Sequence, residues 1–197
     1  AMLRLWLSLA IEFEGNYPPP LPNLDFKIIC GDSLSGHSPR HPGQYQLFQN
    51  QVEIIADQIT ELKHLYVEAW GGEKKNLRNQ ILELESELTG FQSHSYFPSN
   101  SINWRTKFAE VFTSSDGFDI VLANPPYVRM ELLDNKSEKL YKDNFSTVSA
   151  PRADLYVYFY ELAHQLLRDG GSVALITSNK FFSAAYGERL RSYLHSS

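Results

Sequence analysis

FDIVLANPPY, residues 118–127, is the stretch of this sequence that decides the fold. Its first six residues form an apolar run bounded by turn residues, and such a run predicts a buried strand. Asn124, Pro125, Pro126 and Tyr127 follow directly, so an amide, two rigid prolines and an aromatic ring end that strand. In open α/β sheets, ligands bind at the carboxyl ends of strands. The stretch therefore predicts an α/β fold with a site that suits a planar amine substrate.

The segments after this strand predict a complete α/β unit. Residues 153–168 carry one apolar stripe at helical spacing, and the pair Gly170-Gly171 is expected to end that helix. Residues 172–177 predict a second buried strand, which a helical crossover places parallel to the first. The tetrapeptide alone would also fit a proline turn, since Asn-Pro and Pro-Pro are common in loops. The surrounding strands and helix favour a functional role.

The remaining segments of the core are shorter. Residues 3–13 predict a helix, and residues 26–30 predict a short strand that ends in a turn. Short helices are expected within residues 104–112 and 184–193. Cys30 is the only cysteine, which excludes an internal disulfide and makes a cytoplasmic location the default. It is expected to be buried in its strand as a small hydrophobic residue.

Residues 44–89 differ from the rest of the chain. Their apolar residues are spaced alternately three and four apart, and Gly71-Gly72 interrupts the pattern. This predicts two helices folded back as an antiparallel hairpin. The segment contains eight acidic and four basic residues, so it contributes −4 of the formal net charge of −5. The acidic surface is therefore expected to be mainly a solvated face of the hairpin.

Composition limits the classes of partner. With 197 residues the chain is long enough for one domain with a sizeable core. A dedicated DNA-binding domain is usually basic, so a net charge of −5 argues against strong nucleic-acid affinity for the chain as it stands. No apolar run approaches the roughly 20 residues of a membrane span, so no membrane partner is predicted. His37 and His41 lie in a predicted loop, and no metal site is predicted.

The order of these motifs resembles that of the N6-adenine-specific DNA methyltransferases. The resemblance rests on the tetrapeptide after its strand, on Asp154-Leu155-Tyr156 opening a helix, and on GGSVALI at residues 170–176. The nearest group is the type IIG enzymes, single chains that fuse restriction and modification. Two further segments, LRLWLSL at 3–9 and the run from 20 to 34, are also similar to that group.

The resemblance covers residues 2–35 and 104–194, and it implies a fold. We expect a partial Rossmann-like three-layer αβα methyltransferase fold with the helical hairpin inserted into it. Residues 2–43 would be the N-terminal part of the core, residues 44–90 the inserted hairpin, and residues 91–197 the catalytic part.

The resemblance also implies a chemistry, in which a methyl group passes from S-adenosylmethionine to N6 of an adenine in double-stranded DNA. The Asn124 side-chain oxygen and the Pro125 carbonyl would accept the two amine hydrogens and stabilise charge that develops on nitrogen. The rings of Pro125 and Pro126 would hold those acceptors in place. Tyr127 would stack on the adenine, which must first be flipped out of the duplex.

Four residues are expected to bind the cofactor by the same resemblance: Asp32, Ser33, Asn124 and Asp154. Asp32 could instead cap its own turn, and Asp154 could instead sit at a helix N-terminus, where the helix dipole favours it. A further group, Lys180, Phe181 and Phe182, follows the second strand. It is expected to border the target site, although phenylalanines at such positions are more often part of a core.

Two parts of the resembling family have no match here. The glycine-rich loop that holds the cofactor's methionine part and the acidic residue that binds its ribose would both precede residues 3–9, and the sequence contains no GxG pattern. We therefore expect an internal piece of a larger enzyme that is inactive alone and binds S-adenosylmethionine weakly. Missing strands would leave apolar edges uncovered, so self-association is also expected.

Two alternatives remain open from the sequence. Glutamine-N5 methyltransferases that act on release factors, and guanine-N2 methyltransferases that act on RNA, carry the same tetrapeptide because they also methylate a planar amine nitrogen. The second alternative is a non-catalytic interaction fragment built around the helical hairpin.

Overall fold

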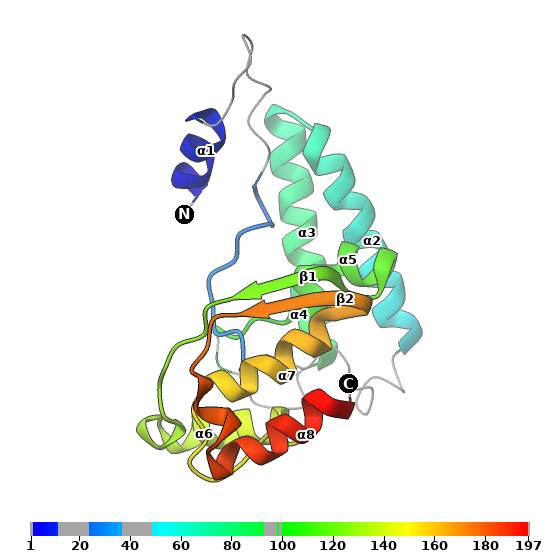
Figure 1. Cartoon of the computed structure of the whole chain (residues 1–197). Helices are drawn as coiled ribbons and strands as arrows, with labels where there is room; N and C mark the ends of the chain where they lie inside the picture. Colours follow the sequence, from blue (N-terminus) through cyan, green and yellow to red (C-terminus); the bar gives the residue numbers. More distant parts are fainter. Residues whose placement is uncertain (1, 12–23, 37–48, 93–97, 99, 197) are drawn as a thin grey trace.

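The computed structural model describes residues 2–11, 24–36, 49–92, 98 and 100–196, and it is a mixed α/β structure (Figure 1). His37, His41 and the last two residues of the helix predicted at 3–13 lie outside these residues. No helix among the described residues is long and apolar enough to cross a membrane. The helices are α1 (Met2–Ile11), α2 (Gln49–Glu68), α3 (Gly71–Gln92), α4 (Trp104–Lys107), α5 (Ala109–Ser115), η2 (Met130–Leu132), α6 (Asn135–Asn144), α7 (Tyr156–Leu166), η3 (Asn179–Phe182), η4 (Ala185–Gly187) and α8 (Glu188–Ser196).

The two strands, β1 (Phe118–Ala123) and β2 (Leu167–Leu175), pair parallel as predicted. Ile120 is opposite Ser172 and Ala123 is opposite Leu175, but Phe118 is opposite Leu167, so β2 contains extra residues in a bulge. Gly170 lies in this bulge with φ of 75°, a backbone conformation that favours glycine. The double glycine therefore does not end α7, because that helix already ends at Leu166. The two glycines instead lie in the bulge, after which β2 pairs with β1 in regular register from Ser172 onward.

Helix α7 forms the centre of the core and lies across one face of the strand pair (Figure 1). Tyr156, Val157 and Tyr158 at its start are fully buried. They belong to one apolar cluster with Phe145 after α6 and Leu190 of α8. Because this cluster fixes the start of α7, it also fixes the loop that enters the helix beside the ends of both strands.

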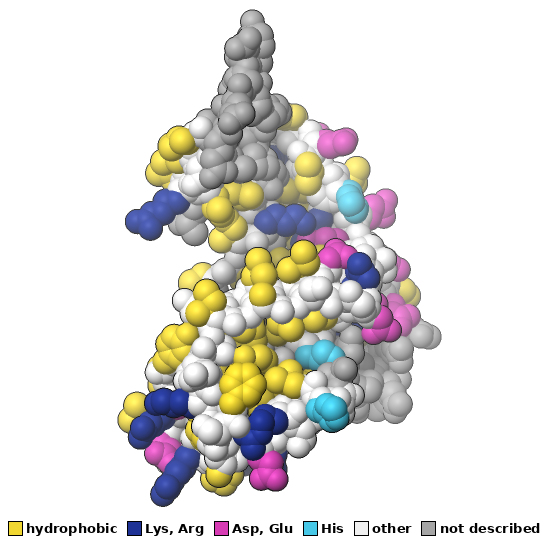
Figure 2. All heavy atoms as spheres, viewed as in Figure 1, with side chains coloured by type: hydrophobic (Ala, Val, Ile, Leu, Met, Phe, Trp, Pro, Cys, Tyr) yellow, Lys and Arg dark blue, Asp and Glu magenta, His cyan; other side chains and the backbone are white. Residues whose placement is uncertain are grey.

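The other face of the strand pair is exposed, which contradicts the prediction of buried strands. Ile120 is 62% exposed and Leu122 is 74% exposed. Val121 points the other way and packs against the core, as the two-residue period of a strand requires. Figure 2 shows hydrophobic side chains gathered along the strands on this face. Among the described residues the sheet has two strands and one covering helix layer, so the expected three-layer fold stays a prediction.

We expect this exposed face to drive self-association in solution. Parallel sheets are normally covered on both faces, and burying one leucine side chain is worth about 1.5–3 kcal/mol. Leu122→Glu should therefore weaken a concentration-dependent dimer, as measured by sedimentation velocity across a dilution series. Leu132→Glu is the matched control, because Leu132 is 76% exposed on η2 rather than on the sheet. A chain that stays monomeric at every concentration would contradict the expectation.

The predicted strand at residues 26–30 is wrong. These residues form turns and irregular backbone, and Phe26 has φ of 62°. The nearby bridge, between Asp32 and Ser101, lies just after the predicted strand. The ring of Phe26 instead packs edge-to-face on Tyr66 of α2 at 5.2 Å between centroids. Cys30 is exposed, not buried. A neighbouring helix, not a sheet, therefore supplies the partner of Phe26.

The helical hairpin is confirmed, with α2 and α3 side by side and the break at residues 69–70 (Figure 1). Its apolar seam continues into α5, because Ile59 and Leu88 share a buried cluster with Ala109. Of the eight acidic residues, seven are exposed, as expected, and one, Glu85, is buried. The hairpin is thus packed against the residues that precede β1.

A buried ion network joins the hairpin to α5. The Lys63 Nζ atom is 3.0 Å from Glu110 Oε2 and 3.6 Å from Glu85 Oε1, and it donates to the Lys107 carbonyl at 2.6 Å. Lys107 pairs with Glu85, and Lys27 pairs with Glu110 at 2.8 Å. Burial alone would raise the pKa of Glu110, but the hydrogen bond from Lys27 and the charge of Lys63 outweigh it and hold that pKa below its ordinary value.

Candidate active site

The tetrapeptide lies at the carboxyl end of β1, where the sequence predicts a site. The Ala123 carbonyl accepts a hydrogen bond from the Ile176 N–H at 3.0 Å, which extends the strand pairing to the start of the tetrapeptide. Asn124 is exposed, and its amide has no hydrogen-bond partner among the described residues. Pro125 is buried, which anchors the segment.

Tyr127 is held on the surface by its hydroxyl. The Tyr127 O–H donates to the Ile176 carbonyl at 3.0 Å, while 59% of the side chain is exposed. The hydrogen bond ties the residue after β1 to the residue after β2. The ring is therefore positioned by the end of the neighbouring strand and still presents apolar surface to a ligand.

The loop after the tetrapeptide pairs with the residues before α7. The Leu155 N–H donates to the Val128 carbonyl at 2.7 Å, and the Met130 N–H donates to the Ala153 carbonyl at 3.3 Å. This short antiparallel bridge places Arg129 opposite Asp154. Residues about 25 positions apart in the sequence thus meet through backbone pairing.

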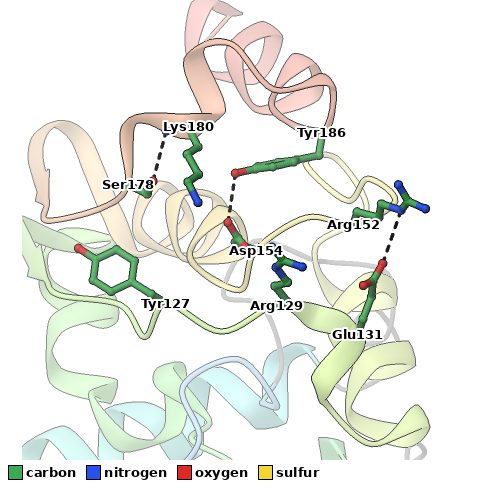
Figure 3. A pocket seen from close by; sticks show the side chains of 8 residues that line it. All are labelled: Tyr127, Arg129, Glu131, Arg152, Asp154, Ser178, Lys180 and Tyr186. Carbon is green, nitrogen blue, oxygen red and sulfur yellow. Dashed lines mark hydrogen bonds and ion pairs between the residues drawn. The ribbon is translucent and has the colours of Figure 1, made fainter.

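Three loops enclose a cleft of about 690 Å³ beside the tetrapeptide (Figure 3). This volume is typical of small-molecule and cofactor sites. The loops are those after β1, before α7 and after β2. Their lining residues are Tyr127, Arg129, Glu131, Arg152, Asp154, Ser178, Lys180 and Tyr186.

Asp154 lines this cleft, and its carboxylate belongs to a chain of hydrogen bonds with two tyrosines. The Tyr186 O–H donates to Asp154 Oδ2 at 3.1 Å, and the Tyr156 and Tyr186 hydroxyls are 3.0 Å apart. Burial, the bond with Tyr156 and the negative charge of Asp154 all raise the pKa of Tyr186, so this hydroxyl stays protonated and donating at neutral pH. Helix α7 begins at Tyr156, and the Asp154 carboxylate is turned toward Tyr186, as Figure 3 shows.

Asp32 and Ser33 do not line the cleft. Asp32 Oδ1 accepts from the Leu34 N–H at 3.0 Å, and Oδ2 accepts from the Tyr141 hydroxyl at 2.5 Å. Burial and the bond to Asp32 raise the pKa of Tyr141. The Ser33 carbonyl accepts from the Trp104 indole N–H at 3.1 Å. These contacts match the turn-capping interpretation of Asp32, and its role toward a cofactor stays a prediction.

The residues after β2 divide between cleft and core. Lys180 lines the cleft, and its side chain is directed into it (Figure 3). Phe181 is 5% exposed and belongs to the core, as expected for a phenylalanine there. Phe182 is 68% exposed, and its ring stacks on that of Phe181 at 4.3 Å between centroids.

Sequence reasoning did not assign five of the lining residues: Arg129, Glu131, Arg152, Ser178 and Tyr186. The two arginines belong to a mixed-charge stretch that carries no motif, and Tyr186 lies within a segment predicted only as a helix. One structural signal marks Arg152, whose φ of 60° is unusual for a residue other than glycine. Such backbone is not readable from the residue letters.

Comparison with known proteins identifies the class to which this fold and cleft belong. Sequences similar to the chain are type II methyltransferases. The profile of the Eco57I restriction-modification methylase family matches residues 1–197, the whole of this sequence. The chain therefore belongs to that family.

Three relatives show how much of such a protein the chain represents. It is 31% identical over 139 residues to the type II methyltransferase M.BstVI of Geobacillus stearothermophilus, covering 60% of this chain and 25% of that protein. It is 40% identical over 74 residues to M.XhoI of Xanthomonas vasicola, covering 38% and 13%. It is 29% identical over 80 residues to the type II restriction enzyme and methyltransferase RM.Eco57I of Escherichia coli, covering 39% and 8%. The matches span a quarter or less of each relative's length.

Proposed function

We propose that this chain supplies the target-amine half of a DNA adenine-N6 methyltransferase that uses S-adenosylmethionine and belongs to a restriction-modification enzyme. The observation that carries the proposal is the position of Asn124. Its amide lies at the carboxyl end of a parallel strand, exposed and unpaired within the described residues. Asn124 does not line the cleft itself, but Tyr127, three residues further on, does. Membership of a restriction-modification methylase family supports DNA as the substrate.

The exocyclic nitrogen of adenine is a poor nucleophile, because its lone pair is delocalised into the ring. An acceptor for each amine hydrogen localises electron density on nitrogen as the new bond forms, which stabilises the transition state. The Asn124 side-chain oxygen and the Pro125 carbonyl are the proposed acceptors. Asn124 is not a general base, since an amide does not take up a proton at neutral pH. A flipped base would gain roughly 1–3 kcal/mol by stacking on the exposed ring of Tyr127.

The proposed cofactor residues divide into two groups. Asp154 fits, because it lines the cleft and only one of its oxygens accepts from Tyr186. Asn124 fits because its exposed amide is unpaired within the described residues, although it is not among the lining residues. Asp32 and Ser33 fit less well, because the chain already uses both Asp32 oxygens and the Ser33 carbonyl. When bound, S-adenosylmethionine would supply a methyl group on a positively charged sulfur. That the chain alone binds it weakly stays a prediction.

The position of the transferred methyl group tests this function. The full-length protein should methylate unmethylated DNA, and digestion followed by mass spectrometry should identify the product as N6-methyladenine. A release-factor peptide carrying the target glutamine and a structured RNA are the parallel substrates. Methylation of the peptide or the RNA, with none of DNA, would replace the proposal by one of the two other amine methyltransferase activities.

A further inference from the structure

Three basic side chains converge on the cleft from three separate loops. Arg129 follows the tetrapeptide, Arg152 precedes α7, and Lys180 lies in η3 after β2. Figure 3 shows the Lys180 ammonium and the Arg129 guanidinium directed toward the space between the loops. Residues so far apart in sequence form one cationic rim only because the backbone brings the loops together.

The rim retains charge that the chain does not neutralise. Arg152 has one ion pair, at 3.8 Å from Glu131, and both side chains are largely exposed, so this pair contributes little. Arg129 and Lys180 have no ion pair with any described residue. The lining contains three basic and two acidic residues, and one of the acids, Asp154, already accepts a hydrogen bond from Tyr186.

This local charge is opposite in sign to the chain as a whole. The formal net charge is −5, and the hairpin accounts for most of it. The surface of a protein with net negative charge repels polyanions. Basic side chains without an ion pair that gather at one cleft therefore favour an anionic ligand at that cleft. The exposed ring of Tyr127 and the half-buried ring of Tyr186 accompany them. Cations beside exposed rings are the combination that binds a nucleic-acid strand through its phosphates and its bases.

We propose that Arg129 and Lys180, assisted by Arg152, bind the phosphodiester groups that flank the target base. This assignment rests on the proposed function and adds the backbone contacts that hold the strand while the base occupies the site. Phosphate contacts position a strand and carry no sequence information. The rim should therefore contribute the same binding free energy for every nucleotide sequence.

Salt dependence of binding by the 197-residue chain tests the rim. Fluorescence anisotropy with a labelled single-stranded oligonucleotide, repeated over a range of low salt concentrations, gives the affinity and its slope against salt. The double variant Arg129→Gln/Lys180→Gln should lose about tenfold in affinity, and its slope should fall by about 1.4, since each contact to a single strand contributes about 0.7. The matched control, Lys75→Gln/Arg78→Gln, removes the same two residue types from the exposed surface of α3 and should have a smaller effect and an unchanged slope.

Two further arms identify the ligand group. An oligonucleotide with uncharged methylphosphonate linkages should bind the wild type and the rim variant equally, because the phosphate charge is gone. Circular dichroism should show the same fold in all variants, since every substituted side chain is exposed. Equal slopes for the rim and control variants, or wild-type binding that does not respond to salt, would overturn the proposal.

The outcome is independent of the methyl-transfer chemistry. Asn124→Ala should leave the salt slope unchanged, because Asn124 carries no charge. A protein that forms N6-methyladenine but shows no slope difference at the rim would keep the proposed function and reject the phosphate contacts. A slope difference at the rim without any adenine methylation would keep the phosphate contacts and reject the proposed function.

Discussion

Replacing Asn124 with alanine in the full-length protein should lower the rate of adenine methylation by at least about 10²-fold, the cost of removing one oriented transition-state hydrogen bond. Asn124 is exposed at the end of β1, and its side chain makes no hydrogen bond within the described residues. The substitution therefore removes an acceptor for the substrate without breaking a contact that supports the fold. Single-turnover methylation measures the chemical step directly.

The binding of cofactor and DNA distinguishes this role from a structural one. Affinity for S-adenosylmethionine by calorimetry should change little in Asn124→Ala, because the lost hydrogen bond acts mainly in the transition state. Asn76→Ala is the matched control, since Asn76 is exposed on α3, away from the cleft. Near-normal turnover by Asn124→Ala would refute the assigned role.

Lys63→Met should destabilise the chain by about 3 kcal/mol, measured as the free energy of unfolding in urea. The Lys63 side chain is 7% exposed and that of Glu85 is 3% exposed, so the lysine is the buried cation of the network that joins α2 and α3 to α5. Methionine keeps the length of the side chain but removes the positive charge that lies beside the Glu85 and Glu110 carboxylates. The estimate is at the lower end of the usual range because Lys27 still pairs with Glu110 and Lys107 with Glu85.

The pH dependence gives the same prediction a second readout. The pKa of Glu110 is held below its ordinary value, so its ionised form stabilises the folded state at neutral pH. This stabilisation is present above the pKa of the unfolded chain and is lost as pH falls through the folded-state pKa. The penalty of Lys63→Met should therefore shrink in acid, where a protonated Glu110 needs no cation. Lys75→Met, on the exposed surface of α3, should cost little at any pH.

Much of the local structure could be predicted from residue patterns. The heptad spacing in residues 44–89 identified the hairpin, because apolar side chains at that period must meet along one seam. The apolar run at 118–123 identified β1, and the double glycine with the apolar run after it identified the parallel partner. The predicted strand at 26–30 is wrong because four apolar residues around Lys27 do not say whether a strand or a helix will cover them. Here Tyr66 of α2 covers Phe26.

The candidate site was predictable only in part for a related reason. Asn124 through Tyr127 are contiguous, so their place at the end of one strand follows from the sequence alone. Arg152 and Tyr186 reach the cleft that Tyr127 lines through backbone pairing and through hydrogen bonds across loops. Asp32 was expected near the cofactor, but its carboxylate accepts hydrogen bonds from the Leu34 N–H and the Tyr141 hydroxyl.

The sequence by itself determined the motif chemistry, the hairpin and the two parallel strands, because each depends on neighbours along the chain. Only the tertiary structure decided which charges and rings share a cleft, which carboxylates are already occupied, and which sheet face is left uncovered. Those properties depend on contacts between residues distant in sequence, and each such contact is set by the packing of the whole core rather than by any local pattern.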